Sequence, residues 1–385
     1  MHKFQELSGE KLCIRCLGRV FASVGHTFTN DQRGSNLIFA SQCIGEEIFP
    51  TVESECVLCE GIFLKIPEYA NEISQRLENY EYKTILIGSS FPMEVLEKER
   101  LIQEKYGSMG EPIKKEFSRE LGKYFVNAYG KEFNRTDPDI MVKVNVEFMS
   151  IELQIKSILI YGTYNKLIRG IPQTRWIKYS EKTDTVESLI GEPLKEMGRG
   201  KDFVLHGAGR EDVDVKMLGN GREFVIELTD PRTRSINLDQ LEQIINNAGR
   251  GVNVSNLRFS TREEIRKIKN EKYFKVYRAV LETDGKMECN KLKEICGEFN
   301  GKVIYQRTPL RVSSSRSDLI RERTVVSMRA ECAENGEKVL TIEAEAGTYI
   351  KELISGDDGR TRPSLSERMG EDIRISELDV IEIKR

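Results

Sequence analysis

A turn dense in glycine and charge, residues 206–215, contains the side chains best suited to chemistry. It offers three carboxylates, on Glu211, Asp212 and Asp214, close to the guanidinium of Arg210. Small residues let a backbone turn sharply and approach a ligand, and an arginine beside a carboxylate can hold it ionised. Taken alone, the segment is more typical of a solvated loop. Its residue types leave open which carboxylate would react.

Two Cys-x-x-Cys pairs near the N-terminus, Cys13 with Cys16 and Cys56 with Cys59, have the spacing of a metal site. Each pair can wrap one edge of a tetrahedral ion, and four thiolates close the coordination sphere. The alternative is four small buried residues, since free cysteine packs like a small hydrophobe. We predict one structural zinc ion. The other cysteines stand alone and are expected to be packing residues: Cys43, Cys289, Cys296 and Cys332.

The overall charge does not indicate a nucleic-acid partner, because the formal net charge is -3 and phosphate binders usually carry a basic excess. Any basic surface must therefore be local. Residues 154–179 contain five basic residues and no acid, and residues 307–323 contain five arginines against two acids. We expect phosphates to bind at these two windows.

The composition, 39% hydrophobic and 31% charged over 385 residues, is typical of a folded protein with more than one domain. No stretch approaches the roughly 20 apolar residues of a membrane span. The N-terminus has no signal-peptide core, and the paired cysteines fit a reducing compartment. We expect a cytoplasmic protein with no membrane partner, and no feature calls for an obligate protein partner.

The elements that must position these residues divide the chain into three predicted domains. Residues 1–62 form the metal-binding module, residues 63–178 a small α/β domain, and residues 200–385 the largest domain, joined by a polar connector at 179–201. The last domain alternates strands and helices in a pattern typical of an α+β fold with a mostly antiparallel mixed sheet.

Local periodicity predicts individual elements within these domains. Apolar residues at intervals of three and four indicate a long helix from about 92 to 129, and strict alternation indicates strands at 140–148 and 151–155. Ser260 and Glu263 have capping-box spacing. Further strands and helices are expected at 203–205, 224–228, 238–248, 252–259, 275–283, around 292–299, and at 303–305, 324–332, 338–346 and 378–383.

Four blocks in order resemble a known family of archaeal tRNA pseudouridine synthases, family ten. The run Gly209–Gly219 resembles the catalytic motif, whose aspartate lies two residues after the arginine, at Asp212. Residues 275–278 resemble the motif of the active-site tyrosine, residues 306–312 the start of a thumb loop, and residues 347–354 the motif of a basic residue that pairs with the aspartate. Each block is weak alone; their order is specific.

The resemblance implies roles for individual residues. Asp212 would be the nucleophile, Lys351 the cation paired with it, and Tyr277 the ring that stacks on an extruded uracil and assists proton transfer from C5. The implied substrate-binding residues are Tyr277, Tyr349, Arg210, Arg307 and Arg311.

The resemblance also implies the reaction: isomerisation of uridine to pseudouridine in the TΨC arm of tRNA, at position 54, 55 or both, without a catalytic cofactor. Residues 157–166 look like part of a THUMP RNA-binding domain. THUMP domains also occur in RNA methyltransferases and thiolation enzymes, but no G-x-G-x-x-G or P-loop opens a helix here. A non-catalytic zinc-containing RNA-binding protein is the other alternative.

Overall fold

The computed structural model describes residues 6–7, 9–106, 110–175, 184–271, 273–285, 287–313 and 316–384. It divides into two compact units, Met1–Lys156 and Ser157–Arg385, which we call unit 1 and unit 2. Within the described residues, no helix has the length and apolar character needed to cross a membrane.

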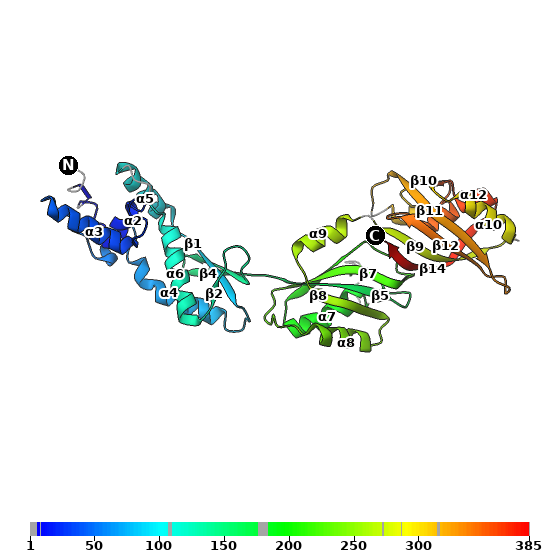
Figure 1. The fold of residues 1–385 in the computed structure, drawn as a ribbon, viewed down its shortest axis with the longest axis horizontal. Coiled ribbons are helices and arrows are strands. Elements are labelled where there is room, and N and C mark those ends of the chain that lie inside the picture. The colour runs from blue at the N-terminus through cyan, green and yellow to red at the C-terminus, as the bar shows by residue number, and fades with distance from the viewer. Residues whose placement is uncertain are drawn as a thin grey trace. The chain divides into compact units, whose positions relative to one another are not determined.

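Unit 1 combines a four-stranded sheet with helices, as Figure 1 shows. The strand order is β2-β1-β3-β4, with β1 parallel to both neighbours and β4 antiparallel to β3. The strands are β1 (Thr84–Ser90), β2 (Glu132–Phe133), β3 (Ile140–Asn145) and β4 (Ser150–Ile155). The helices are α2 (Ile14–Val20), α3 (Asn30–Cys43), α4 (Ile66–Arg76), α5 (Met93–Lys105) and α6 (Ile113–Tyr129), with 3-10 turns at Glu53–Glu55 and Ile62–Lys65.

The core of unit 1 includes the cysteines. One cluster of buried residues contains Cys13, Cys16, Cys56 and Cys59 together with residues of α4, α6 and the sheet, such as Phe117. The expected division between a 1–62 module and a following domain therefore differs from the structure, in which both halves share one core. The amphipathic face of α6 supplies much of this core, because its apolar residues recur at helical spacing.

Unit 2 is built on a ten-stranded sheet in the order β13-β10-β11-β12-β9-β14-β7-β5-β8, with β6 beside β7. All pairs are antiparallel except β14 with β7. The strands are β5 (Ile158–Lys166), β6 (Asp202–Gly207), β7 (Val215–Thr229), β8 (Val252–Phe259), β9 (Phe274–Thr283), β10 (Lys302–Arg307), β11 (Ile320–Cys332), β12 (Lys338–Glu345), β13 (Thr361–Arg362) and β14 (Ile373–Lys384). This confirms the predicted α+β class with a mostly antiparallel sheet.

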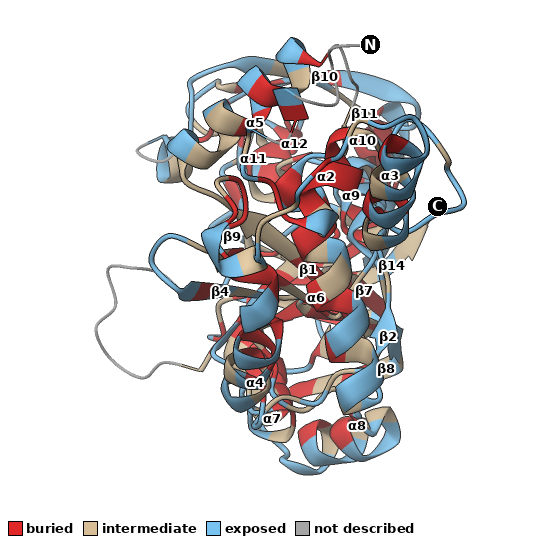
Figure 2. Ribbon diagram, turned by 90° about the vertical axis from the view of Figure 1, so that its left-hand side faces the viewer, coloured by how far each residue is buried: buried red, intermediate tan, exposed pale blue. Residues whose placement is uncertain are grey.

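Helices cover the two ends of this sheet. They are α7 (Val186–Gly198), α8 (Leu238–Asn247), α9 (Arg262–Asn270), α10 (Cys289–Glu298), α11 (Ile350–Ser355) and α12 (Leu365–Met369), with a 3-10 turn at Leu310–Val312. Figure 1 shows α7 and α8 beside β5, β7 and β8, and α10 and α12 beside β10 and β11. Figure 2 shows that α8 is buried on one side only, where Leu241 and Ile245 lie.

Three predictions of elements were wrong. The connector 179–201 contains α7, whose Thr185 cap and buried Val186, Leu189, Ile190 and Leu194 make it part of the core; residues 179–183 lie outside the described part of the chain. Residues 158–166 form β5 of the large sheet, so the expected boundary at 178 differs from the division at 156/157. The single helix over 92–129 is two helices, because Pro112 stands as the N-cap of α6.

Two smaller expectations also differ from the structure. Thr261, not Ser260, is the N-cap of α9, and the hydroxyl of Ser260 donates to Glu264. Cys289 and Cys332 are joined in a disulfide that ties the start of α10 to the end of β11. Spacing of 43 residues gave no hint of this pairing, since a disulfide depends on where the fold brings two Cβ atoms together.

Candidate active site

A cleft of about 700 Å³ opens in unit 2 beside the acidic turn, a size suited to a nucleoside. Its walls come from segments far apart in the sequence: the acidic turn, the end of α9, β9, the start of the thumb loop, the segment before α11, and β14. The lining side chains used below are Arg210, Asp212, Arg222, Lys275, Tyr277, Arg311, Arg316, Tyr349 and Lys351.

Glu211 is excluded as a reactive group by its surroundings. Its side chain is 1% exposed and lies 2.9 Å from Arg222 Nε, which is equally buried. The hydroxyl of Tyr164 donates to both of its carboxylate oxygens at 2.9 Å. Glu211 is therefore a structural carboxylate. The candidates for the reactive carboxylate are then Asp212 and Asp214.

Asp212 faces two cations in the cleft. Its Oδ2 lies 2.9 Å from Arg311 Nη1 and 3.6 Å from Lys351 Nζ, with 39% of the side chain exposed. Arg311 is itself fixed by Glu352, 2.6 Å from its Nε. The cation predicted for Asp212 was Lys351; the structure places Arg311 nearer.

Asp214 is the more exposed acid of the turn, at 64%, and it accepts the shorter contacts of Lys351, at 2.6 and 2.8 Å. Partial burial acts to raise the pKa of Asp214, but the hydrogen bond and charge of Lys351 outweigh it and lower that pKa. Lys351 thus bridges Asp212 and Asp214 and lies closer to the second.

The two predicted tyrosines both line the cleft. Tyr277 on β9 is 8% exposed, and burial raises its pKa to about 12. Tyr349 accepts a hydrogen bond from Arg316 at 2.8 Å through its hydroxyl. Its backbone is held by the buried amide of Gln306 on β10, which donates to the carbonyl of Tyr349 at 2.9 Å and accepts from its N–H at 2.8 Å.

The predicted arginines divide between two places. Arg210 and Arg311 line the cleft. Arg307 does not: it forms an ion pair with Asp318, Nη2 to Oδ2 at 2.6 Å, and lines a separate hollow with Tyr305 and Arg360. Spacing could not distinguish them, because both lie in the same arginine-rich window.

Two of the five cations in the basic window 154–179 support the acidic turn from within the fold. Lys166 is fully buried, and its Nζ donates to the carbonyls of Ile171, Asp212 and Val213 at 2.9, 3.0 and 3.1 Å. Arg169 donates to the carbonyl of Asp214 at 2.8 Å and pairs with β14. These cations hold the acidic turn from below. Lys178 lies outside the described residues.

Sequence reasoning assigned no role to Lys275, a cleft residue inside the block that resembles the tyrosine motif. The available indication was its spacing: Lys275 stands two residues before Tyr277 on a strand, so the two side chains share a face.

The four paired cysteines of unit 1 come together as their spacing predicts. Their sulfurs all lie within 4.8 Å of one another and all four residues are buried. With Zn–S bonds of about 2.3 Å, tetrahedral geometry separates two sulfurs by about 3.8 Å, and Cys13 Sγ lies 3.7 Å from Cys59 Sγ. The residues therefore fit a closed tetrahedral metal site.

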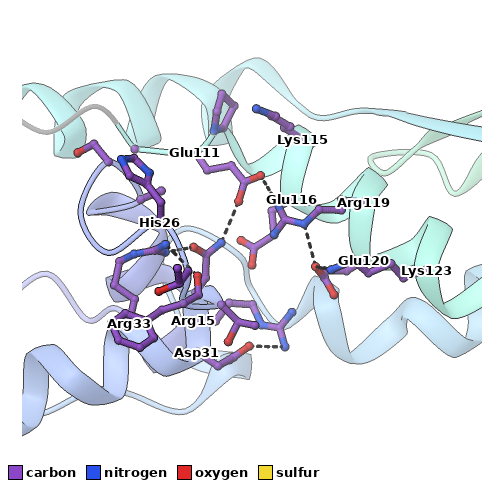
Figure 3. Close-up of a pocket in the computed structure, with 18 residues that line it drawn as sticks. Arg15, His26, Asp31, Arg33, Glu111, Lys115, Glu116, Arg119, Glu120 and Lys123 are labelled. Atoms are coloured by element: carbon purple, nitrogen blue, oxygen red, sulfur yellow. Dashed lines mark hydrogen bonds and ion pairs between the residues drawn. The ribbon is translucent and has the colours of Figure 1, made fainter. Parts of the chain in front are cut away.

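Unit 1 also has a cavity of about 640 Å³ between the helices α2 and α3 and the start of α6. Figure 3 shows two of its arginines directed toward acids: Arg15 lies 3.2 Å from Asp31, and Arg119 lies 3.0 Å from Glu120. Because these two ion pairs offset part of the positive charge, the cavity is a weaker candidate for an anionic ligand than the cleft of unit 2.

Comparison with known proteins gives consistent matches. Residues 159–384 match the family model "Pus10, C-terminal", and residues 69–145 match "Pus10 THUMP domain, archaeal". The THUMP match lies in unit 1, so the assignment of residues 157–166 to such a domain was wrong.

Three relatives carry the name tRNA pseudouridine synthase Pus10. The chain is 46% identical to the protein of Thermoplasma acidophilum over 100% of this chain and 99% of that one. It is 44% identical to that of Picrophilus torridus over 99% of each chain, and 39% identical to that of Pyrococcus furiosus over 100% of this chain and 97% of the relative. A solved Cbf5-Nop10-Gar1 complex has a TM-score of 0.32 and 18% identity over 60% of this chain and 59% of that chain.

Proposed function

This chain belongs to the Pus10 family of tRNA pseudouridine synthases, and we propose that it isomerises uridine to pseudouridine in the TΨC arm of tRNA, at position 54, position 55 or both. It works as a cytoplasmic enzyme on free tRNA. Family membership removes the methyltransferase, thiolation and non-catalytic alternatives. The observation that carries the proposal is the meeting of Asp212, Arg311, Lys351 and Tyr277 in one cleft.

The chemistry requires little beyond a positioned carboxylate. The N1–C1′ bond of uridine breaks, the uracil turns, and a C5–C1′ bond forms while C5 loses a proton and N1 gains one. The oxidation state of the substrate does not change, so no catalytic cofactor is invoked. Asp212 is the nucleophile, attacking either C1′ of the ribose or C6 of the base, and both routes are compatible with the proposal.

The neighbours of Asp212 prepare it for this attack. Arg311 and Lys351 place two positive charges 2.9 and 3.6 Å from its Oδ2. Extruding the target uridine costs roughly a few kcal/mol. Stacking on Tyr277 and contacts with Tyr349 and Arg210 offset this cost, and Arg307 contacts phosphate from outside the cleft.

The cysteine site of unit 1 holds one structural zinc ion in this proposal. Cys13, Cys16, Cys56 and Cys59 are its four ligands, and they leave no position for an activated water. The ion would stabilise the unit that contains the THUMP domain, which grips the part of the tRNA outside the cleft.

The test is to map pseudouridine on an unmodified tRNA transcript by carbodiimide labelling and primer extension. The wild type should give a stop at position 54, 55 or both. Asp212→Asn, which keeps the shape and removes the charge, should give no product at saturating enzyme while binding tRNA within about threefold of wild type. Asp214→Asn is the matched control and should remain active. An inactive Asp214→Asn together with an active Asp212→Asn would assign the reaction to the other carboxylate.

A further inference from the structure

Lys275 is a cation in the active-site cleft that the mechanism above does not use. It lies on β9, and its side chain points to the same face as that of Tyr277 because strand side chains alternate. Both residues are buried, at 7% and 8% exposed. Lys275 therefore faces the part of the cleft, beside the ring of Tyr277, in which a uracil would bind.

Among the described residues, Lys275 Nζ has no hydrogen bond or ion pair. The nearest acid that acts on it is Glu211, whose carboxylate is already engaged by Arg222 at 2.9 Å and by the hydroxyl of Tyr164. Arg222 forms an ion pair with Glu211, and its Nη1 donates to the carbonyl of Ala208 at 2.7 Å. The donors of Lys275 therefore remain available to a ligand.

Lys275 Nζ lies close to the backbone of the turn that carries Asp212. Gly209 has φ of +90°, and a Cβ placed there would lie 3.0 Å from Lys275 Nζ and 2.9 Å from Arg222 Nη1. Glycine thus allows the ammonium group to pack directly on the backbone three residues before Asp212. Lys275 and Asp212 both line the cleft.

A charged amine is costly to bury without a partner. Burial and the neighbouring charge of Arg222 lower the pKa of Lys275 to about 7, and the charge of Glu211 opposes this shift. Uncompensated groups of this kind cluster at functional sites. An N–H bond is available to donate in either protonation state.

We propose that Lys275 donates a hydrogen bond from Nζ to a carbonyl oxygen of the flipped uracil and stabilises the negative charge that the base acquires during the reaction. The inference rests on the proposed function. If Asp212 attacks C1′, the electron pair of the broken C1′–N1 bond stays on the uracil and is shared by O2 and O4. If it attacks C6, the C5=C6 electron pair moves toward O4. Charge develops on a carbonyl oxygen in both routes, and a preorganised donor stabilises it.

The first test compares single-turnover rates at saturating enzyme on a uridine-containing tRNA. Lys275→Met keeps the size of the side chain and removes the donor, so the rate should fall by about 100-fold to 1000-fold while the dissociation constant for tRNA changes by less than about threefold. Lys302→Met is the control, because Lys302 is exposed on β10 of the same sheet and lies outside the cleft. Its rate should equal that of the wild type.

The second test uses tRNA transcribed with 5-fluorouridine. Fluorine at C5 withdraws electrons and stabilises the charged base, so this substrate depends less on Lys275. The fold-loss in rate caused by Lys275→Met should therefore be at least about tenfold smaller on the fluorinated tRNA than on the uridine tRNA. The rate is measured as consumption of the target base in each tRNA. A merely structural role would give equal losses on the two substrates.

Either equal losses on the two substrates or a Lys275→Met rate within threefold of wild type would overturn the inference. Lys275→Gln retains an N–H donor. If the Met variant does not fold, the Gln variant takes its place on both substrates, and its loss should again be smaller on the fluorinated tRNA; if both variants fold, Gln should be faster than Met on uridine. A wild type that forms no pseudouridine contradicts the proposed function instead, so the two failures are distinguishable.

Discussion

At the scale of single residues, the proposed nucleophile Asp212 lies in a network of charges rather than in one ion pair. Arg311 connects Asp212 to Glu352 on α11, and Lys351 connects Asp212 to Asp214. The two cations come from the thumb loop and α11, so the charge around Asp212 depends on both segments being in place. The two cations differ in what their loss would leave behind. Removing Arg311 leaves the buried Glu352 without this ion-pair partner, whereas removing Lys351 affects Asp214, which is 64% exposed, and Asp212, which keeps Arg311.

Lys351→Met is therefore the cleaner test of the charge at Asp212. We expect its single-turnover rate at saturating enzyme to fall by about 10-fold to 100-fold, because a cation at this distance in a partly exposed site supplies a few kcal/mol at most before solvent screening. The dissociation constant for tRNA should change less than the rate. Asp214→Asn, which leaves Lys351 its charge, should stay within about threefold of wild type. An unchanged Lys351→Met rate, or equal damage from both variants, would remove this ion pair from the mechanism.

The sequence predicted only part of the site. The three acids of the turn were visible, but their burial was not, and it is burial that sets Glu211 apart from Asp212. Arg311 and Asp212 are 99 positions apart in the chain, and Arg307 resembles Arg311 in every local respect. Which arginine reaches the cleft depends on how the loop after β10 turns, and local pattern does not encode that.

At the scale of elements, the acidic turn is held by β5, which sequence reasoning placed in another domain. Lys166, the last residue of β5, donates to the carbonyls of Asp212 and Val213 and to that of Ile171. By donating to these three carbonyls, the buried Lys166 positions the turn that carries Asp212.

Lys166→Met should show this as a combined loss of stability and rate. Leaving buried carbonyls unsatisfied costs about 1–3 kcal/mol each where no water replaces the donor. The free energy of unfolding of unit 2 should therefore fall by at least about 2 kcal/mol, which denaturant titration measures as a lower midpoint concentration. At a temperature where the variant is folded, the single-turnover rate should fall more than tRNA affinity does. The reason is that the substitution shifts the acidic turn that carries Asp212 and leaves the rest of the tRNA-binding surface unchanged. A variant that melts and reacts like wild type would show that the three hydrogen bonds are dispensable; Lys302→Met is the matched control.

Elements were predictable where one face of a local pattern is buried. The residues of α6 and α8 repeat at helical spacing, and β9, β12 and β14 appear close to where the sequence indicates. The failures are of a different kind. The polar stretch before residue 201 contains α7 because four apolar residues at helical spacing outweigh its charges. The partners of β5 are β7 and β8, reached only after many intervening residues, and alternation within a strand does not identify its neighbours.

At the scale of the whole molecule, the two units have separate cores. The buried apolar residues of unit 1 form one cluster, and those of unit 2 form two others. The cysteine site belongs to the first, where Cys13, Cys16, Cys56 and Cys59 pack with residues of α4, α6 and the sheet. A metal ion bound at this site should therefore stabilise all of unit 1, beyond the segment between the cysteines, and should not affect the stability of unit 2.

Removing the metal tests this division. Binding free energy at a closed thiolate site is largely folding free energy, so chelation should lower hydrogen-exchange protection throughout residues 14–155 and leave that of β7, β9 and β14 unchanged. Purified wild type should contain about one equivalent of zinc, and a Cys13→Ser, Cys16→Ser double variant much less. The metal-free enzyme should lose tRNA affinity while keeping most of its single-turnover rate on bound tRNA, because the cleft is formed by unit 2 alone. Less than about half an equivalent in the wild type would count against the site. Loss of protection confined to residues 13–59 would instead support an independent module, and loss in β9 or β14 would show that the stability of unit 2 depends on the metal after all.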